Sequence, residues 1–340
     1  MAPLNNVTGN LTQIISSLFI YTQIEARFLV YYHVEIVLSV VTVLTNITTL
    51  AVISCNSKLR ILSNVFFASL AVCDVFQGIF GLIFNGIRIY GCVTNDWSDL
   101  GYAGSSALQF LWWFATIYSY GCLILITLER WIFIAHPLVY KRSWNVKVTV
   151  LGLLGFSVAS FAGSYIAISR GLFSANIKYV FPVAHTVVSF VIFSAYVHII
   201  VISYRQQRAI LRLVVGPDYK TRTSCEETHY ILCRNWKALK MSLIVFTTYF
   251  CTVSPWTYFQ AFQTLTSPSE LKAEVAQALN TITCVHFCSN FFVYASQNRD
   301  FYDVLKEYCT RLCKCRDRPN QMRTVSSGVM SMSTPDQLHM

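Results

Sequence analysis

Residues 125–140, LITLERWIFIAHPLVY, place an acid and an arginine, Glu129 and Arg130, at the end of a long apolar run that begins near Gly101. Ionisable side chains are costly inside a membrane, so a charged pair at this position indicates either the edge of a membrane span or a functional site. The composition of the surrounding chain decides first which class of protein contains the pair.

The whole chain is far more apolar than a soluble domain. Of its 340 residues, 54% are hydrophobic, 15% are aromatic and only 12% are charged. Seven runs are long enough to cross roughly 30 Å of hydrocarbon as helices. These expected spans are 30–55, 61–90, 101–135, 146–169, 177–204, 237–262 and 272–297. We therefore expect an all-α membrane protein, a seven-transmembrane helix bundle with a short amphipathic helix after the seventh span.

The basic residues predict the orientation of the bundle. With the N-terminus outside, 5 of the 26 Lys and Arg residues lie at the outer side and the others lie at the inner side. Because cytoplasmic loops retain Lys and Arg, we expect an extracellular N-terminus and a cytoplasmic C-terminus at the plasma membrane. Glycosylation sequons at Asn6 and Asn10 agree with this orientation. The net charge of +10 then reflects topology and contact with anionic lipid, and does not predict nucleic-acid binding.

The expected organisation has four parts. These are a glycosylated tail over 1–29, the bundle over 30–298, a juxtamembrane amphipathic helix with a cysteine cluster over 299–316, and a disordered cytoplasmic tail over 317–340. Within the bundle, the polar segment 206–236 predicts the longest internal loop, because Gly216 and Pro217 break it. Cysteines near a membrane among basic residues are candidates for palmitoylation, or are unmodified thiols. They are Cys309, Cys313 and Cys315.

A carboxyl group, Asp74, lies about halfway through the second span. It can be held protonated or hydrogen-bonded within the bundle, or it can bind a cation together with other oxygen ligands. Asn46, Ser119 and Asn290 are the candidate partners, and hard oxygen donors suit Na⁺ better than a transition metal. We expect no required cofactor, and an allosteric Na⁺ near Asp74 as the alternative to a purely structural role.

Five motifs in order resemble those of rhodopsin-like (class A) G-protein-coupled receptors. They are Asn46 in the first span, SLAVCD ending at Asp74, TLERW followed by HPLVY, Pro255, and the seventh-span stretch NFFVYASQNRDF. The resemblance implies an activation switch that comprises Glu129, Arg130, Tyr196, Pro255, Asn290 and Tyr294. In this interpretation Arg130 pairs with a carboxylate in the closed bundle and is released for an intracellular partner.

Several positions depart from the family pattern. Ser105 replaces the cysteine expected at the outer end of the third helix, and 169–177 contains no cysteine, so we expect the usual disulfide to be absent. Val188 and Phe291 replace prolines, and Val253 replaces the tryptophan of the sixth helix. The missing disulfide and proline resemble the melanocortin, lysophospholipid and cannabinoid branch, whereas ITLERW resembles glycoprotein-hormone receptors. These positions do not assign the chain to one branch of the family.

The resemblance also implies a ligand pocket in the outer half of the bundle. The carried-over positions are Gln109, Trp112, Trp113, Thr116, Trp256, Gln260, Asn280 and Cys284. Trp112 replaces the aspartate of monoamine receptors and Cys284 replaces the retinal lysine of opsins, so we expect neither an amine salt bridge at that position nor an opsin. An aromatic lining with few charges favours an apolar, lipid-like or peptide ligand, although the tryptophans could equally be packing residues. Glu35, Arg88 and Glu274 could add charged contacts or face water.

The hypothesis that follows is a cell-surface receptor that binds an extracellular ligand and activates heterotrimeric G proteins, with arrestin and membrane lipids as further partners. The alternative is a decoy or biased receptor with weak G-protein coupling, since two switch residues are replaced. A transporter or channel would need a polar path through the membrane, and beyond Asp74 and His286 the spans offer little for one. No catalytic cluster predicts an enzyme.

Overall fold

The computed structural model describes residues 4–94, 102–169, 179–214, 219–263 and 270–316, and within these ranges it contains helices and no strand. The elements are α1 (Leu4–Cys55), a 3-10 turn η1 (Ser57–Leu59), α2 (Leu62–Thr94), α3 (Tyr102–Ala135), α4 (Pro137–Ser143), α5 (Val146–Ser169), α6 (Val180–Val214), α7 (Tyr219–Gln263), α8 (Glu270–Gln297) and α9 (Arg299–Arg316). The predicted fold class is confirmed: seven long helices form a bundle, and a short helix follows the seventh.

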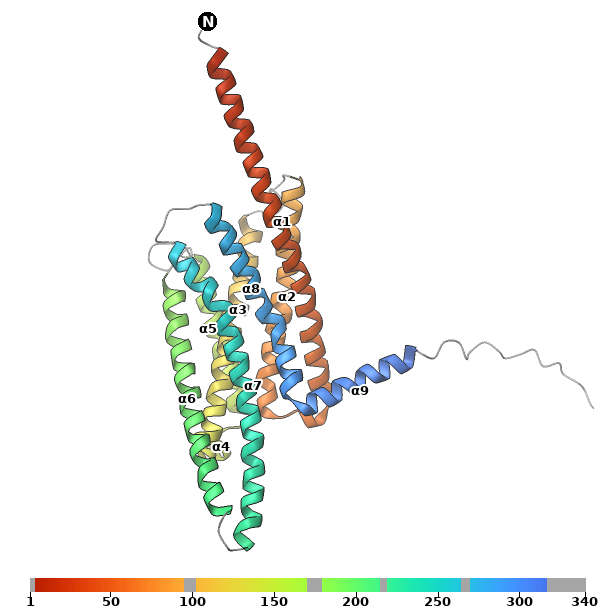
Figure 1. The fold of residues 1–340 in the computed structure, drawn as a ribbon, viewed down its shortest axis with the longest axis vertical. Coiled ribbons are helices and arrows are strands. Elements are labelled where there is room, and N and C mark those ends of the chain that lie inside the picture. Colours follow the sequence, from red (N-terminus) through yellow and green to blue (C-terminus); the bar gives the residue numbers. More distant parts are fainter. Residues whose placement is uncertain (1–3, 95–101, 170–178, 215–218, 264–269, 317–340) are drawn as a thin grey trace, which may run out of the picture.

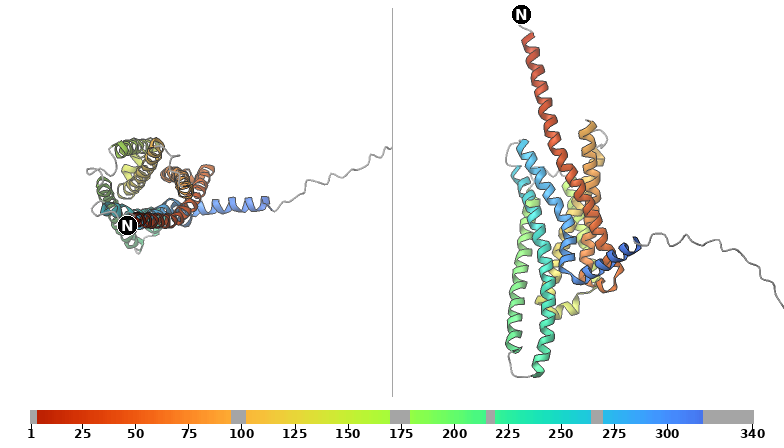
Figure 2. Two further views of the ribbon diagram at one scale, coloured as in Figure 1. Left: turned by 90° about the horizontal axis from the view of Figure 1, so that it is seen from above. Right: turned by 45° about the vertical axis from the view of Figure 1, so that its right-hand side comes forward.

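The seven long helices lie side by side, with α4 and α9 at the end of the bundle opposite the N-terminus (Figure 1). We call this end, which holds Glu129 and Arg130, the Arg130 end, and we call the other the N-terminal end. Helix α1 packs between α2 and α8, while α3 contacts α2, α5, α6 and α7. The view along the bundle shows α9 pointing away from it (Figure 2). Helix α3 therefore connects more of the bundle than any other helix.

Five of the long helices are apolar and long enough to cross a membrane, by length and composition alone. They are Arg27–Cys55, Leu62–Thr94, Ser106–Ala135, Val146–Ser169 and Val180–Ala209. The described parts of α7 and α8 do not meet that standard, because their apolar stretches are interrupted by Thr, Ser, Tyr, Gln and Asn side chains. Polar side chains are tolerated in a membrane helix where they face the bundle interior, as those of α8 do at the site described below.

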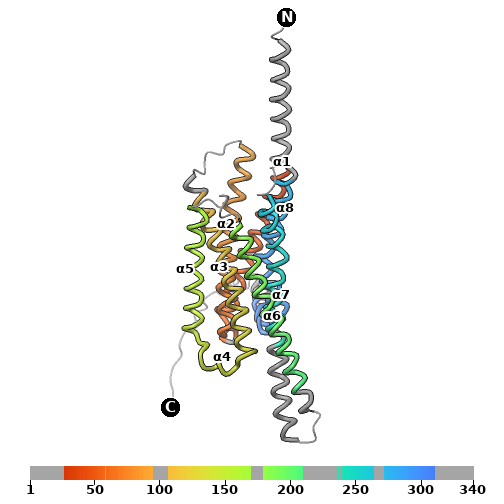
Figure 3. Tube along the Cα trace, turned by 90° about the vertical axis from the view of Figure 1, so that its left-hand side faces the viewer, coloured from red at the N-terminus to blue at the C-terminus, as the bar shows by residue number. Residues whose placement is uncertain are grey.

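Helix α5 shows how the membrane reverses the usual pattern of burial. It lies at an edge of the bundle (Figure 3), where it packs on α3. Ser160 and Ser164 are completely buried, whereas the side chains of Leu151 and Val158 are 67% and 70% exposed. Small side chains allow two helices to approach closely in lipid, where apolar contact with the surroundings costs nothing. The exposed apolar side chains of α5 therefore fit a lipid-facing surface.

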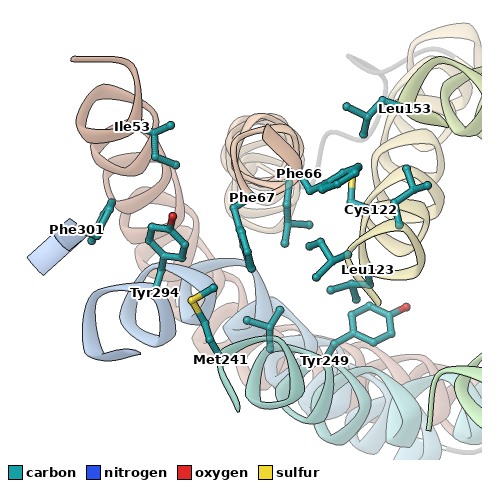
Figure 4. Packing of buried hydrophobic residues seen from close by; sticks show 14 of the residues in the cluster. Ile53, Phe66, Phe67, Cys122, Leu123, Leu153, Met241, Tyr249, Tyr294 and Phe301 are labelled. Atoms are coloured by element: carbon teal, nitrogen blue, oxygen red, sulfur yellow. The ribbon is translucent and has the colours of Figure 1, made fainter. Parts of the chain in front are cut away.

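Two clusters of buried apolar side chains join the helices near the Arg130 end. The larger includes Phe66, Phe67, Cys122, Leu123, Met241, Tyr249, Tyr294 and Phe301, which lie between α2, α3, α7, α8 and α9 (Figure 4). The second joins α3, α6 and α7 through Ile134, Ile192, Tyr196, Ile199, Leu239 and Phe246. Close packing of this kind makes the relative positions of the helices discrete rather than continuously adjustable.

The prediction of a long loop over 206–236 is wrong. Helix α6 continues to Val214 and α7 already begins at Tyr219, so most of the polar segment is helical (Figure 1). Polar composition shows that a segment leaves the membrane, but Arg, Lys, Gln and Glu are good helix formers and can continue a helix into water. Only 215–218, which includes Gly216 and Pro217, separates the two helices.

The predicted amphipathic segment forms helix α9 directly after α8. Asn298 accepts a hydrogen bond of 3.1 Å from the backbone N–H of Phe301, as an N-cap residue does. Phe301 is completely buried and its ring lies 4.7 Å from that of Tyr294, whereas Tyr302 and Tyr308 are exposed. The expectations for the side chains of Asn6, Asn10, Ser105, Cys313 and Cys315, and those for 170–178 and 317–340, lie outside the described residues.

Candidate functional site

A cavity of about 850 Å³ opens in the N-terminal half of the bundle, between α1, α2, α3, α7 and α8. Its size is typical of a small-molecule site. All the predicted ligand-binding residues except one line it: Gln109, Trp112, Trp113, Trp256, Gln260, Asn280 and Cys284. Ligand binding at these residues stays a prediction, but the structure does bring residues from three helices to a single space.

The exception among the predicted ligand residues is Thr116. Its hydroxyl donates to the carbonyl of Trp112 at 2.8 Å and accepts from Nε2 of Gln77 at 2.7 Å. It faces a hollow of about 10 Å³ beneath the cavity, beside Ser119, Tyr249 and His286. Thr116 therefore belongs to the polar interior below the ligand cavity.

Three tryptophans form the inner part of the cavity. The ring of Trp112 lies 5.1 Å from that of Trp113 and 6.0 Å from that of Trp256, both edge to face. Trp113 is also 5.0 Å from Phe181 on α6, and Phe181 stacks on His185. Aromatic pairs in this geometry favour an apolar or aromatic partner over a charged one. The cavity is thus connected by ring contacts to α6 and α7.

Glu35 of α1 is the charged residue most closely built into the cavity, and the sequence offered little to distinguish it. The side chain is only 2% exposed, and its Oε1 accepts hydrogen bonds from Gln277, Asn280 and Thr281 of α8 at 2.8, 3.0 and 2.7 Å. Because its donors lie 242 to 246 residues away in the sequence, no local pattern could reveal the contact.

The other two charged candidates differ. Arg88 of α2 lines the cavity, with its guanidinium 4.1 Å from the ring centroid of Phe84 and 5.2 Å from that of Tyr32. Glu274 is instead paired with Arg27 at 3.6 Å, outside the residues that line the cavity. The structure therefore separates the three: Glu35 and Arg88 reach the cavity, and Glu274 joins α8 to α1.

At the opposite end of the bundle, Glu129 connects three elements. Its Oε2 lies 3.3 Å from Nε of Arg130, and its Oε1 accepts hydrogen bonds from Ser63 of α2 at 3.0 Å and Tyr140 of α4 at 2.9 Å. The side chains of Glu129 and Arg130 are 2% and 10% exposed. An ion pair thus joins Glu129 to Arg130, although Nε of Arg130 makes no hydrogen bond with a described residue; the role of the pair as a switch stays a prediction.

Tyr140 is the last residue of HPLVY and lies in α4, outside the membrane spans. Burial raises the pKa of its phenol above the ordinary value, and the neighbouring Glu129 raises it further. The hydroxyl therefore keeps its proton and donates to Glu129 over the whole physiological range. Sequence reasoning placed HPLVY near the switch but did not identify Tyr140 as a partner of Glu129.

Trp131, which occupies the family's tyrosine position, connects α3 to α6. Its indole N–H donates to Nδ1 of His198 at 2.9 Å, and its ring lies 5.3 Å from that of His136. The predicted switch residue Tyr196, also on α6, is 1% exposed and lies 3.4 Å from the hydroxyl of Thr127. Two side chains of α6 therefore contact α3 next to Arg130.

Asp74 occupies the middle of the bundle and is completely buried. Its Oδ2 accepts a hydrogen bond of 2.8 Å from Nδ2 of Asn290. Its Oδ1, the hydroxyl of Ser119 and Oδ1 of Asn290 are buried with no hydrogen-bond partner among the described residues. Unsatisfied buried oxygens are costly, and three from different helices fit the donor set that Na⁺ prefers. Asn46 is not part of this set, because it donates to the carbonyls of Thr42 and Phe287 at 2.9 Å.

The remaining switch residues lie between this centre and the Arg130 end. Tyr294 is 2% exposed, with its ring 5.1 Å from Phe67, and its hydroxyl has no partner among the described residues. Pro255 lies inside α7, where it cannot donate to the carbonyl one turn earlier. The next carbonyl along the helix, that of Thr252, accepts a hydrogen bond of 3.1 Å from the hydroxyl of Thr283 on α8. The proline thus falls where α7 is also held by a side chain of α8.

The sequence matches the family described as the 7 transmembrane receptor (rhodopsin family) over residues 45–294, which is most of the chain. The chain belongs to this family. As a class A G-protein-coupled receptor it is a multi-pass membrane protein and not an enzyme. Squid rhodopsin has a similar structure, with a TM-score of 0.71 and 13% sequence identity, over 86% of this chain and 87% of that one. At this identity the likeness concerns the fold of the receptor alone.

Among the described residues, no group of three or more His, Cys, Asp and Glu side chains in this receptor could hold a metal ion. The oxygen set at Asp74 differs from such a group, because two of its members are Ser119 and Asn290. The receptor therefore has three connected regions: the cavity, the polar centre at Asp74, and the Glu129–Arg130 network.

Proposed function

We propose that the chain is a cell-surface receptor that binds an extracellular ligand in the 850 Å³ cavity and activates a heterotrimeric G protein at the Arg130 end. The observation that carries the proposal is the closed network around Glu129, which lies at the far end of the same bundle from a ligand-sized cavity. A ligand that prefers an arrangement of the bundle in which the contacts of Glu129 are broken would release Arg130. A few kcal/mol of differential affinity is enough to shift such an equilibrium by orders of magnitude.

The proposed orientation places the cavity outside the cell and α4 and α9 inside it. The distribution of basic residues supports this, as do the sequons at Asn6 and Asn10. If the N-terminal end faces the secretory lumen, Asn6→Gln and Asn10→Gln together should abolish a glycosidase-sensitive mobility shift. A shift that persists in the double variant would require another acceptor.

The cavity lining supports a ligand with a substantial apolar body. The tryptophans contact one another in the cavity, and amides and three charged side chains, those of Glu35, Arg88 and Lys272, also line it. This arrangement suits a lipid-like molecule or an apolar peptide better than a small hydrophilic ion.

Na⁺ would be held by Asp74, Ser119 and Asn290 and would supply positive charge to oxygens that have no hydrogen-bond partner among the described residues. Its proposed role is allosteric. By holding α2, α3 and α8 together at this centre, the chain's own oxygens would favour the closed bundle.

The inner surface supports further partners. Helix α9 turns away from the bundle axis (Figure 2), as expected of an amphipathic helix on the inner leaflet. Cys309 on this helix is exposed. We propose palmitoylation at Cys309, Cys313 and Cys315, and arrestin as a partner of the serine-rich tail.

The test is G-protein activation across the G-alpha families in cells, comparing the wild type with Arg130→Ala at matched surface expression. Cells would be exposed to lipid and peptide pools. Activation by the wild type that Arg130→Ala loses or alters supports the proposal. Wild-type activation that is unchanged in Arg130→Ala would contradict the assigned role of Arg130.

A second candidate function is a decoy or biased receptor with weak G-protein coupling. Two observations favour it: Val253, which is 4% exposed, fills the position of the family's tryptophan, and Phe291 packs 6.1 Å from Phe301 where the family has proline. Ligand capture or arrestin recruitment without G-protein activation would identify this function.

A further inference from the structure

One oxygen of the Glu35 carboxyl group accepts hydrogen bonds from described residues, and the other accepts none from them. All its hydrogen bonds, from Gln277, Asn280 and Thr281, converge on Oε1. Oε2 receives none from the residues that the structure describes, and Glu35 lines the cavity. A carboxylate can accept about four hydrogen bonds, so Oε2 retains its full capacity for a donor on a ligand.

Two cations, Arg88 and Lys272, line the same cavity, and Arg88 has no anionic partner among the described residues. Its guanidinium lies over Phe84 and Tyr32, at 4.1 and 5.2 Å from the ring centroids. It forms no ion pair or hydrogen bond with any residue that the structure describes, Glu35 included. The planar fork of a guanidinium matches a carboxylate or phosphate, and the rings hold it in place for such a group.

The contacts between α1 and α2 give the order of these groups along the cavity. A side chain at Gly81 would collide with Ser39, so these two residues lie at one level, and Arg88 lies at the level of Tyr32. Glu35 is between Tyr32 and Ser39 on α1, which places it about one helical turn, roughly 5 Å, inward of Arg88. The guanidinium of Arg88 and the carboxyl group of Glu35 therefore follow one another inward along the cavity.

Gln77 shows that the tryptophans lie deeper still. Its side chain donates to the backbone carbonyl of Trp112 at 3.2 Å, and it precedes Gly81 by one helical turn on α2. From the level of Arg88 to that of Gln77 is 11 residues, or about 16 Å along a helix. A body that extends from a head at Arg88 to the tryptophans must therefore be longer than the side chain of a free amino acid.

We propose that the cavity binds a long-chain zwitterion in which an acid group, an ammonium group and an apolar chain follow one another. The acid binds Arg88, the ammonium group donates to Oε2 of Glu35, and the chain reaches Trp112 and Trp256. A single-chain 2-amino-alkyl phosphate has this order. The inference rests on the proposed function, since it assigns the ligand of that same cavity.

Three long-chain probes test the assignment on the full receptor purified in detergent: a 2-amino-alkyl phosphate, the alkyl phosphate without the amine, and the alkylamine without the phosphate. O-phosphoethanolamine is the head without the chain, and phenylalanine is the short zwitterion. Binding is measured by calorimetry and by the thermal unfolding shift, for the wild type, Glu35→Gln, Arg88→Gln and Glu274→Gln. The last variant changes a carboxyl group outside the cavity lining.

We expect each cavity variant to lose affinity only for the probes that carry the group its side chain binds. The amino-alkyl phosphate should bind more tightly than the other probes, and each cavity variant should weaken it by about 10- to 100-fold, as expected for a hydrogen bond to a charged group. Glu35→Gln should leave the alkyl phosphate unaffected, Arg88→Gln should leave the alkylamine unaffected, and Glu274→Gln should bind all probes like the wild type. The interpretation then does not depend on a variant folding perfectly, because each variant has a probe that it should still bind.

Three results would overturn the proposal: no wild-type binding of the amino-alkyl phosphate up to about 100 μM, which is weak for a cavity of this size; equal binding of the zwitterion and the single-charge probes; or an equal loss for all probes in a cavity variant. Stronger binding of phenylalanine or O-phosphoethanolamine would overturn the long-chain assignment. Binding of the amino-alkyl phosphate without G-protein activation would support this inference and contradict the proposed function. G-protein activation by other ligands, without binding of these probes, would support the proposed function and contradict this inference.

Discussion

The phenol of Tyr140 donates a hydrogen bond of 2.9 Å to the Oε1 of Glu129, whose other oxygen lies 3.3 Å from Nε of Arg130. Helix α4 is therefore joined to the charged pair of α3 by one side chain, and Ser63 adds α2. A carboxylate that holds two hydroxyls and a guanidinium stabilises the closed arrangement of this end of the bundle. Its removal should be visible in the basal activity of the receptor.

Glu129→Gln should raise basal G-protein activation. The variant loses the negative charge that restrains Arg130 and weakens two charge-assisted hydrogen bonds. A loss of about 1–2 kcal/mol from the closed state raises the open population by roughly 5- to 30-fold while that population is small. Basal activation at matched surface expression is the measurement, and Glu274→Gln at the far end of the bundle is the control. Unchanged basal activity in Glu129→Gln would show that the network does not restrain the receptor.

Tyr140→Phe should lower the unfolding temperature of the purified receptor by about 2 °C, because it removes one hydrogen bond worth about 1 kcal/mol. The difference in unfolding temperature between the wild type and Tyr140→Phe should become smaller only at high pH. Burial and Glu129 raise the pKa of Tyr140 in the folded state, so its stabilisation is full below the unfolded pKa of about 10 and declines as pH rises above that value.

The measurement for Tyr140 is thermal unfolding of both proteins between about pH 6 and pH 11. A constant difference up to about pH 10 is expected. A difference that disappears near neutral pH would mean that Glu129, and not the phenol, controls this contact.

Trp131 and His198 should be energetically coupled. Trp131→Phe removes the indole N–H that donates to His198, and His198→Ala removes the acceptor, so the double variant should be little less stable than the worse single variant. A coupling energy of about 0.5–1.5 kcal/mol is expected for one hydrogen bond with its ring contact. Thermal unfolding of the four proteins gives the cycle. Trp131→Phe with His33→Ala, whose histidine is on α1, is the additive control; additivity in the first pair would exclude coupling.

Sodium ions should stabilise the receptor through Asp74. At tenfold excess over Kd, binding to the folded state adds about 1.4 kcal/mol, which raises the unfolding temperature by a few degrees relative to choline chloride at the same ionic strength. Asp74→Asn and Ser119→Ala should lose this difference, because each removes an oxygen that has no hydrogen-bond partner in the part of the chain that the structure describes. Cys251→Ser, on the exposed side of α7, should keep it. A sodium effect that survives Asp74→Asn would place the ion elsewhere.

The sequence determined the fold class, a bundle of seven long helices followed by a short amphipathic helix. This follows from hydrophobic run length and from the high cost of charges in lipid, which act on neighbouring residues and can be read along one chain. The same reasoning misjudged 206–236, because polarity reports contact with water and does not distinguish a loop from a helix that leaves the membrane. The pairing of Arg130 with a carboxylate was implied by the resemblance to the receptor family.

Tertiary structure decided the contents of the cavity and the partners of each charge. Glu35 accepts hydrogen bonds from three side chains of α8, Glu274 pairs with Arg27 outside the cavity lining, and Asn46 donates to the backbone carbonyl of Phe287 on α8 and not to Asp74. Each of these outcomes depends on which faces of distant helices meet. That is determined by the packing of the whole bundle, since a buried polar group takes whichever partner the packing brings within hydrogen-bond distance.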